Sequence, residues 1–219
     1  MKNNEAKSLI GCCGIYCGLC TKYQSKAPSR CIGCKLGEQH SWCSIWKCCV
    51  KKHGFETCTE CSEIFNCTIF LRRKVAEWTP AADNLRKIKE DGLENWVEGQ
   101  KERQILVEEL LRSYNEGHSM SFYCKACTRM PINLINQAIK EVKKKIVSEK
   151  IDNSDMKLKA KIFKSTIKDI TVNLMSIWIK KNKNAPSPTV ITQHIWFRSH
   201  WSLYSNCSPR SQRRICWEC

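Results

Sequence analysis

The stretch CCGIYCGLC, residues 12–20, is the first of several cysteine pairs that decide how this chain folds. It is followed by CIGC at residues 31–34 and by CTEC at residues 58–61. Twelve of the 17 cysteines lie between Cys12 and Cys67, so they form a local framework rather than being scattered through the chain. Cysteines that serve only as small buried hydrophobes have no reason to recur in pairs at this spacing.

The pairs are typical of metal ligands. Two cysteines separated by two residues in a tight turn can aim both sulfurs at one ion, and a second pair completes a tetrahedron. The sequence shows no apolar run long enough for a signal peptide or a membrane span. We therefore expect a cytoplasmic protein with reduced thiols and no membrane partner. Ten cysteines are candidate metal ligands: Cys13, Cys17, Cys20, Cys31, Cys34, Cys43, Cys48, Cys58, Cys61 and Cys67.

Ten thiolates suffice for two four-ligand zinc sites. The preferred grouping places Cys17, Cys20, Cys31 and Cys34 around one ion, and Cys43, Cys48, Cys58 and Cys61 around the other. His40 and His53 are close enough in sequence to replace a thiolate, but the cysteines already suffice.

An iron–sulfur cluster remains the alternative cofactor, because iron also accepts thiolates. The spacing Cys13-x-x-x-Cys17-x-x-Cys20 is the one that radical-SAM enzymes use for a four-iron cluster. Those enzymes place it after the first strand of an α/β barrel, and no alternating strand and helix pattern follows here. Zinc is therefore preferred.

The cysteine segments also carry a family resemblance. CGIYCGLC, SRCIGC, WCSIWKC and GFETCTECSEIFNC, followed by DNLRKIKEDGLENWVEGQ, resemble the cysteine-rich domain-of-unknown-function family number 3795 over residues 10–100. The resemblance implies a bacterial or archaeal metal-binding protein that uses the same ten cysteines, and it brings no catalytic activity. Cys12 and Cys49 are extra neighbours of that set, and the interval from Cys61 to Cys67 is one residue longer than the family's.

The fold class expected is mainly α, with a small irregular metal-binding domain followed by amphipathic helices. Apolar residues at helical spacing predict helices from Pro80 to Gly92, from Leu93 to Asn115, from Pro131, and over 154–181. The expected organisation is a metal-binding domain (11–67), a helical segment packed on it (68–117), a second cysteine pair with basic amphipathic helices (118–170), and a poorly ordered, tryptophan-containing tail (171–219).

The net charge of +16 raises the question of a nucleic-acid partner. Residues 131–170 carry ten basic against five acidic side chains, but lysines there are expected to form the solvated faces of helices. Trp42 and Trp46 flank Cys43 and can stack on bases, although packing against the metal loops is the preferred interpretation. Three functions stay open: a metal-stabilised module that binds a protein, a nucleic-acid-binding zinc protein, and an iron–sulfur protein with redox or radical chemistry. No catalytic constellation is identified, so a non-enzymatic role is expected.

Overall fold

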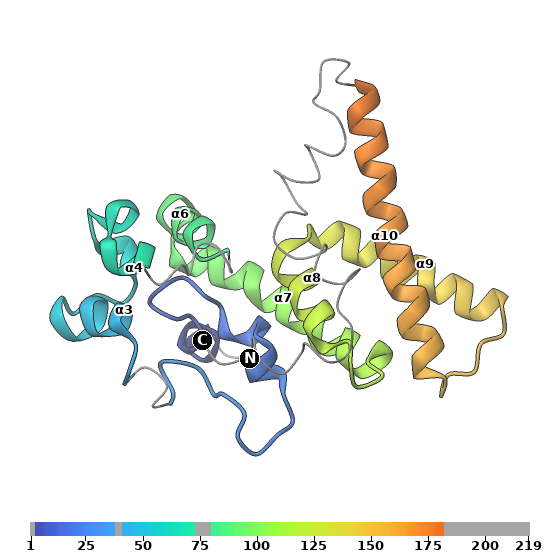
Figure 1. Ribbon diagram of the computed structural model, residues 1–219, viewed down its shortest axis with the longest axis horizontal. Coiled ribbons are helices and arrows are strands. Elements are labelled where there is room, and N and C mark those ends of the chain that lie inside the picture. Colours follow the sequence, from blue (N-terminus) through green and yellow to red (C-terminus); the bar gives the residue numbers. More distant parts are fainter. Residues whose placement is uncertain (1–2, 38–40, 73–79, 182–219) are drawn as a thin grey trace. The chain divides into compact units, whose positions relative to one another are not determined.

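The computed structural model describes residues 3–37, 41–72 and 80–181 (Figure 1). Within these ranges the chain is mainly helical, with the cysteine-rich region ahead of the longer helices, which confirms the predicted fold class. The same ranges contain no strand, and their one isolated β-bridge joins Ile10 to Tyr16. In the part of the chain that the structure describes, no helix combines the length and the apolar character needed to cross a bilayer.

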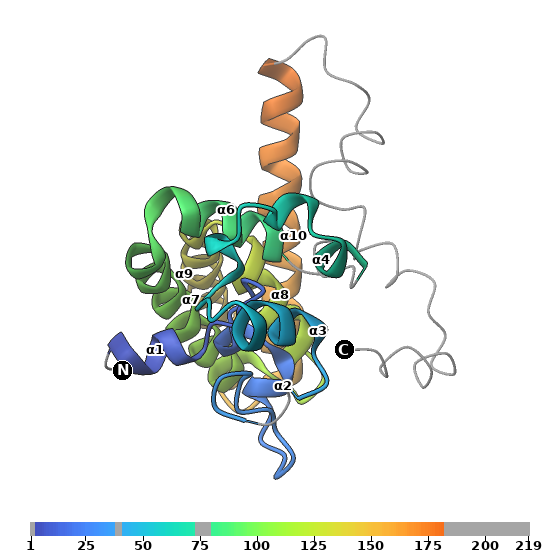
Figure 2. The same ribbon diagram turned by 90° about the vertical axis from the view of Figure 1, so that its left-hand side faces the viewer.

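The cysteine-rich region forms only short helical turns. They are α1 (Asn3–Ser8), η1 (Cys17–Leu19), α2 (Thr21–Gln24), α3 (Ser44–Trp46), η3 (Lys47–Lys52), η4 (Cys58–Glu60), η5 (Ile64–Asn66) and α4 (Thr68–Arg72). The longer helices that follow are α6 (Ala81–Asp91), α7 (Leu93–Tyr114), α8 (Met120–Arg129), α9 (Ile132–Ser148) and α10 (Met156–Lys181). Both views show α7 beside α8, which is the most extensive contact between helices (Figures 1 and 2).

The long helices lie where their apolar spacing predicts them. Gly92 separates α6 from α7 with φ of 81°, a left-handed conformation that favours glycine and ends the first helix. In α9, Ile135, Ile139 and Val142 form the buried stripe. Helix α8 was not predicted, because its residues were interpreted as a cysteine pair between two helices.

Two groups of buried side chains form the interior of residues 1–170. The larger group surrounds α7 and includes Tyr16, Leu110, Tyr123 and Phe163. The smaller group belongs to the cysteine-rich region and to α6: Cys12, Ile45, Cys49, Cys58, Ile64, Phe70, Ala81 and Leu85. Three of its eight members are cysteines, so the sulfurs are central to the packing of this region.

The turn at Gly14 attaches the cysteine-rich region to α6. Asn84 Nδ2 donates to the Gly14 carbonyl at 2.8 Å. Gly14 has φ of 86°, and a Cβ there would lie 2.8 Å from both the Ala81 carbonyl oxygen and Leu85 Cγ. Only glycine therefore fits this turn without strain.

Tyr16 attaches the same segment to α7. Its ring packs edge-on against Trp96 with centroids 6.1 Å apart, and its hydroxyl donates to Gln104 Oε1 at 3.0 Å. All three side chains are buried. The segment that carries the first cysteines is thus fixed against two long helices.

Residue contacts divide the chain into two units, 1–170 and 171–219. Of the second unit, the structure describes only residues 171–181, which form the end of α10. The predicted poorly ordered tail otherwise lies outside the described residues.

Candidate metal centre

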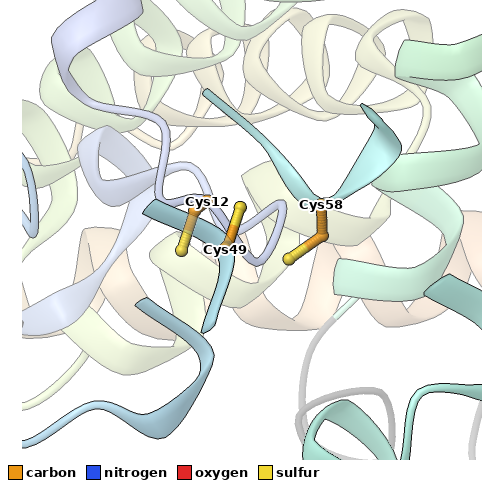
Figure 3. Close-up of side chains that lie close together, drawn as sticks. All are labelled: Cys12, Cys49 and Cys58. Carbon is orange, nitrogen blue, oxygen red and sulfur yellow. The ribbon is translucent and has the colours of Figure 1, made fainter. Parts of the chain in front are cut away.

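Three buried cysteines from separate segments meet in the smaller core. The sulfurs of Cys12, Cys49 and Cys58 all lie within 4.8 Å of one another, and the residues are only 5%, 4% and 7% exposed. Figure 3 shows their side chains approaching from three different parts of the ribbon. These three residues are called the thiol triad below.

Backbone hydrogen bonds hold the three segments of the triad together. The Cys58 amide donates to the Cys12 carbonyl at 2.9 Å, and the Phe55 amide donates to the Cys49 carbonyl at 3.0 Å. The short helix that begins at Cys58 is closed by a capping box, in which Glu60 Oε1 accepts from the Thr57 amide at 3.0 Å. The sulfur positions are therefore set by the backbone, with no contribution from a disulfide.

The triad favours negative charge on one of its sulfurs. Hydrogen bonds from Cys12 and then from Cys58 lower the pKa of Cys49 to about 4, against the effect of burial, and His53 and Lys35 lower it further. The bond to Cys49 is also the main reason that the pKa of Cys12 is raised. In Cys58 the bond with Cys12 lowers the pKa, but the bond to Cys49 and burial outweigh it and raise the pKa. The hydrogen bonds among the three sulfurs thus favour a thiolate at Cys49.

This donor set suits a single thiophilic ion. Zinc at about 2.3 Å from each sulfur in a tetrahedron places the sulfurs about 3.8 Å apart. The separations of up to 4.8 Å in the triad reach that geometry with small side-chain movements. A four-iron cluster interposes several iron atoms, so its cysteine sulfurs must stand farther apart than those around one ion. The geometry is compatible with metal binding, and its scale favours a mononuclear site.

Cys17 and Cys34 form a second pair of interacting thiols, but with Cys20 and Cys31 they make no group of three or more close sulfurs among the described residues. The Cys17 thiol is hydrogen-bonded to the side chain of Cys34, and this bond raises the pKa of Cys17 together with burial. A hydrogen bond with the Cys34 backbone lowers that pKa, whereas electrostatic interactions with Cys34 and Cys20 raise it. The Gly33 amide donates to Cys31 Sγ at 3.4 Å.

Cys13 adjoins both groups. Burial raises the pKa of its thiol to about 12; the Ile15 backbone acts in the opposite direction, and Cys34 and Cys43 raise it. Cys13 also contributes to the raised pKa values of Cys12 and Cys58. Cys13 therefore interacts electrostatically both with cysteines of the triad and with Cys34.

The remaining candidate ligands are arranged differently from the preferred grouping. Cys43, Cys61 and Cys67 are partly buried and pack against the smaller core, and Cys48 is half-buried. The structure does not bring them together with Cys58 into a group of three or more close sulfurs among the described residues. Cys58 instead joins Cys12 and Cys49, the two cysteines that the family pattern treats as extra.

One sequence signal points to Cys49 in preference to Cys48. Ile45 is buried, and Cys49 follows it by four residues, so both lie on one face of the helical segment formed by α3 and η3. Cys48 falls beside that face. The sequence signal for Cys12 is weaker: it follows the buried Ile10 by two residues, and side chains two residues apart in an extended segment point to the same side.

Cys124 and Cys127, the second cysteine pair expected from sequence within residues 118–170, lie three residues apart within α8 and are 3% and 0% exposed. Burial raises the pKa of each thiol to about 12. They pack in the larger core, so they behave as small apolar side chains. An electrostatic interaction with Cys20 also contributes to the raised pKa of Cys124.

The histidines add no ligand to the triad within the described ranges. His53 is exposed and its ring stacks on Phe55 with centroids 5.4 Å apart. His40 lies outside the described residues.

Comparison with known proteins gives no match to a family model, to a curated protein or to a solved structure. The chemistry of this centre therefore rests on its own geometry.

Proposed function

We propose that this protein binds zinc through clustered cysteine thiolates and that the metal holds the cysteine-rich region in shape as an interaction module. The observation that carries the proposal is the thiol triad: three sulfurs from three segments, buried and within 4.8 Å of one another. Structural zinc sites made of thiolates supply folding energy directly, and this region has few other means of stabilisation.

A second zinc ion is proposed for Cys17, Cys20, Cys31 and Cys34. The Cys17–Cys34 hydrogen bond and the amide that donates to Cys31 support this assignment. The resemblance to family number 3795 agrees with metal binding at these positions, and membership of that family is part of the proposal.

The state of the thiols supports a reducing compartment, for which the cytoplasm is proposed. All the cysteines in the described ranges are free, although the sulfurs of the triad are close neighbours. Such thiols persist where glutathione and thioredoxin keep them reduced.

Elemental analysis of the full chain, purified without oxygen and without added metal, tests the proposal. We expect a colourless protein with about two zinc ions per chain, the count that two thiolate sites require. Bound iron together with visible absorption would show that the cofactor is an iron–sulfur cluster and not zinc. A protein that folds fully without any metal would overturn the proposal.

A further inference from the structure

The loops that carry the cysteines have a strong excess of basic side chains. Residues 20–55 contain seven lysines and arginines and one acidic residue, Glu38. The difference of +6 contrasts with residues 1–130 as a whole, where 20 basic side chains face 15 acidic ones. Thiolate-bound zinc removes part of this charge, but its sulfurs are largely buried, whereas most of the basic side chains are exposed.

The basic side chains lie on two loops. Lys26 and Arg30 are exposed on the first, which is closed by a hydrogen bond of 3.1 Å from the Cys31 amide to the Lys22 carbonyl. An open hollow of about 520 Å³ beside this loop is lined by Lys26, Arg30, Tyr23 and, on α7, Glu108.

The second loop contributes three lysines on one side of η3. Lys47, Lys51 and Lys52 are exposed there, while Cys49 between them is buried in the triad. Lys47 and Lys52 are five residues apart, which is about one turn of a π-helix, so these side chains project in similar directions.

The ends of both loops interact electrostatically with the Cys13 thiol. Cys34 ends the first loop and Cys43 begins the second, and both interact electrostatically with Cys13. The basic side chains are thus attached to the same cysteine framework.

An exposed tryptophan stands between these basic groups in the chain. Trp42 is 53% exposed and also interacts with another part of the chain, and Trp46 packs against the smaller core as expected. Ile32 on the first loop and Leu36 just after it are also exposed, at 40% and 53%. Lysines that neutralise phosphates and an aromatic ring that receives a base are the two elements of single-strand recognition.

We propose that the two loops bind single-stranded nucleic acid, with phosphates on Lys26, Arg30, Lys47, Lys51 and Lys52 and a base stacked on Trp42. The proposal rests on the proposed function, because the metal-bound thiolates hold the loops. The lysines of residues 131–170 are less suited to such a partner, since Lys143 and Lys164 there are paired with Glu109 and Glu116.

Fluorescence anisotropy of a labelled single-stranded RNA, titrated with full-length protein of measured zinc content, tests this inference. Trp42→Ala is expected to weaken binding about tenfold, since stacking contributes about 1–3 kcal/mol per base, whereas Trp42→Phe retains most of the affinity. Lys51→Gln with Lys52→Gln is expected to reduce the salt slope by about 1.4, at about 0.7 for each phosphate contact.

Lys140→Gln with Lys144→Gln provides the matched control, because these lysines are exposed on α9, and it should leave the affinity and slope unchanged. Loss of binding in this control would place the site on the helices and overturn the inference. Equal competition by a polyglutamate peptide, with no effect of Trp42→Ala, would show recognition of acidic protein by charge alone and also overturn it. A zinc-loaded protein that does not bind RNA at low salt would refute the inference and leave the proposed function intact.

Discussion

Cys48 and Cys49 are adjacent in sequence, but their surroundings differ. Cys49 is 4% exposed and its sulfur belongs to the triad, whereas Cys48 is half-buried and belongs to no group of close sulfurs among the described residues. At the scale of single residues, which of two neighbouring cysteines binds metal is decided by the direction of the side chain from the helix.

Replacement of these neighbours one at a time tests that assignment. Cys49→Ser is expected to lower the zinc content by about one ion per chain, because it removes one of three close sulfurs. Cys48→Ser is the matched control and should retain the wild-type content. Elemental analysis of both purified variants measures the difference. A loss of zinc in Cys48→Ser alone would show that the triad is not a ligand set.

The buried thiols of α8 should differ from the metal ligands in reactivity. Burial raises the pKa of both Cys124 and Cys127 to about 12, so at pH 8 both are protonated thiols in the folded state. We expect neither to react with iodoacetamide in the native protein after zinc removal, while cysteines of the first 67 residues are labelled. Peptide mass spectrometry identifies the labelled positions, and fast labelling of α8 would contradict the account.

At the scale of elements, the turn at Gly14 determines how the first cysteines meet α6. Gly14 and Gly54 both have positive φ, at 86° and 68°, but only Gly14 has neighbours that a Cβ would meet. A comparison of alanine substitutions at the two positions therefore distinguishes the cost of backbone strain from the cost of steric crowding.

Gly14→Ala is expected to destabilise the zinc-loaded protein by about 2–4 kcal/mol, the sum of left-handed strain and overpacking. Gly54→Ala should cost about 1–2 kcal/mol, from strain alone. Denaturant unfolding of the two variants gives the comparison. Equal losses would show that α6 does not confine the turn as the structure indicates.

Arg103 on α7 caps the C-terminal end of α8 and so links the two helices. On α7, its Nη1 donates to the carbonyls of Cys127 and Met130 at 2.6 and 2.7 Å, at the end of α8. We expect Arg103→Gln to destabilise the protein by about 1.5–3 kcal/mol, since charged hydrogen bonds to otherwise unpaired carbonyls are lost. Arg112→Gln, on the exposed face of α7, is the control. Denaturant midpoints measure both, and equal midpoints would contradict the capping role.

Helical spacing and glycine stops were sufficient to predict the long helices but not the arrangement of the cysteines. The stripe of Ile135, Ile139 and Val142 has one dominant period, so its helix can be read locally. The triad depends on contacts between segments 37 and 9 residues apart, from Cys12 to Cys49 and from Cys49 to Cys58, which spacing does not encode. Helix α8 was missed because its cysteines match a metal-binding pattern and a buried helical face equally well.

At the scale of the whole molecule, the two cores depend on different interactions. The larger one is built mainly from aliphatic and aromatic side chains, with Cys17, Cys124 and Cys127 among them, and the smaller one contains the thiol triad. Removal of metal should therefore affect the two parts of residues 1–170 unequally.

Hydrogen exchange before and after chelation measures this difference. We expect amides of residues 41–61 to lose protection from exchange, because removal of the ion leaves their cysteine sulfurs without a partner. Amides of α7 and α9 should keep their protection. Exchange that rises equally along all the described helices would show a single cooperative unit and contradict the account.

X-ray absorption at the zinc edge of the protein purified without oxygen tests whether clustered thiolates bind zinc. We expect a first shell of sulfur at about 2.3 Å, without a dominant nitrogen or oxygen shell. At equal protein concentration the zinc edge step should fall by about half in Cys49→Ser and stay unchanged in Cys48→Ser. A shell of nitrogen or oxygen, or a protein that contains iron in place of zinc, would contradict the claim.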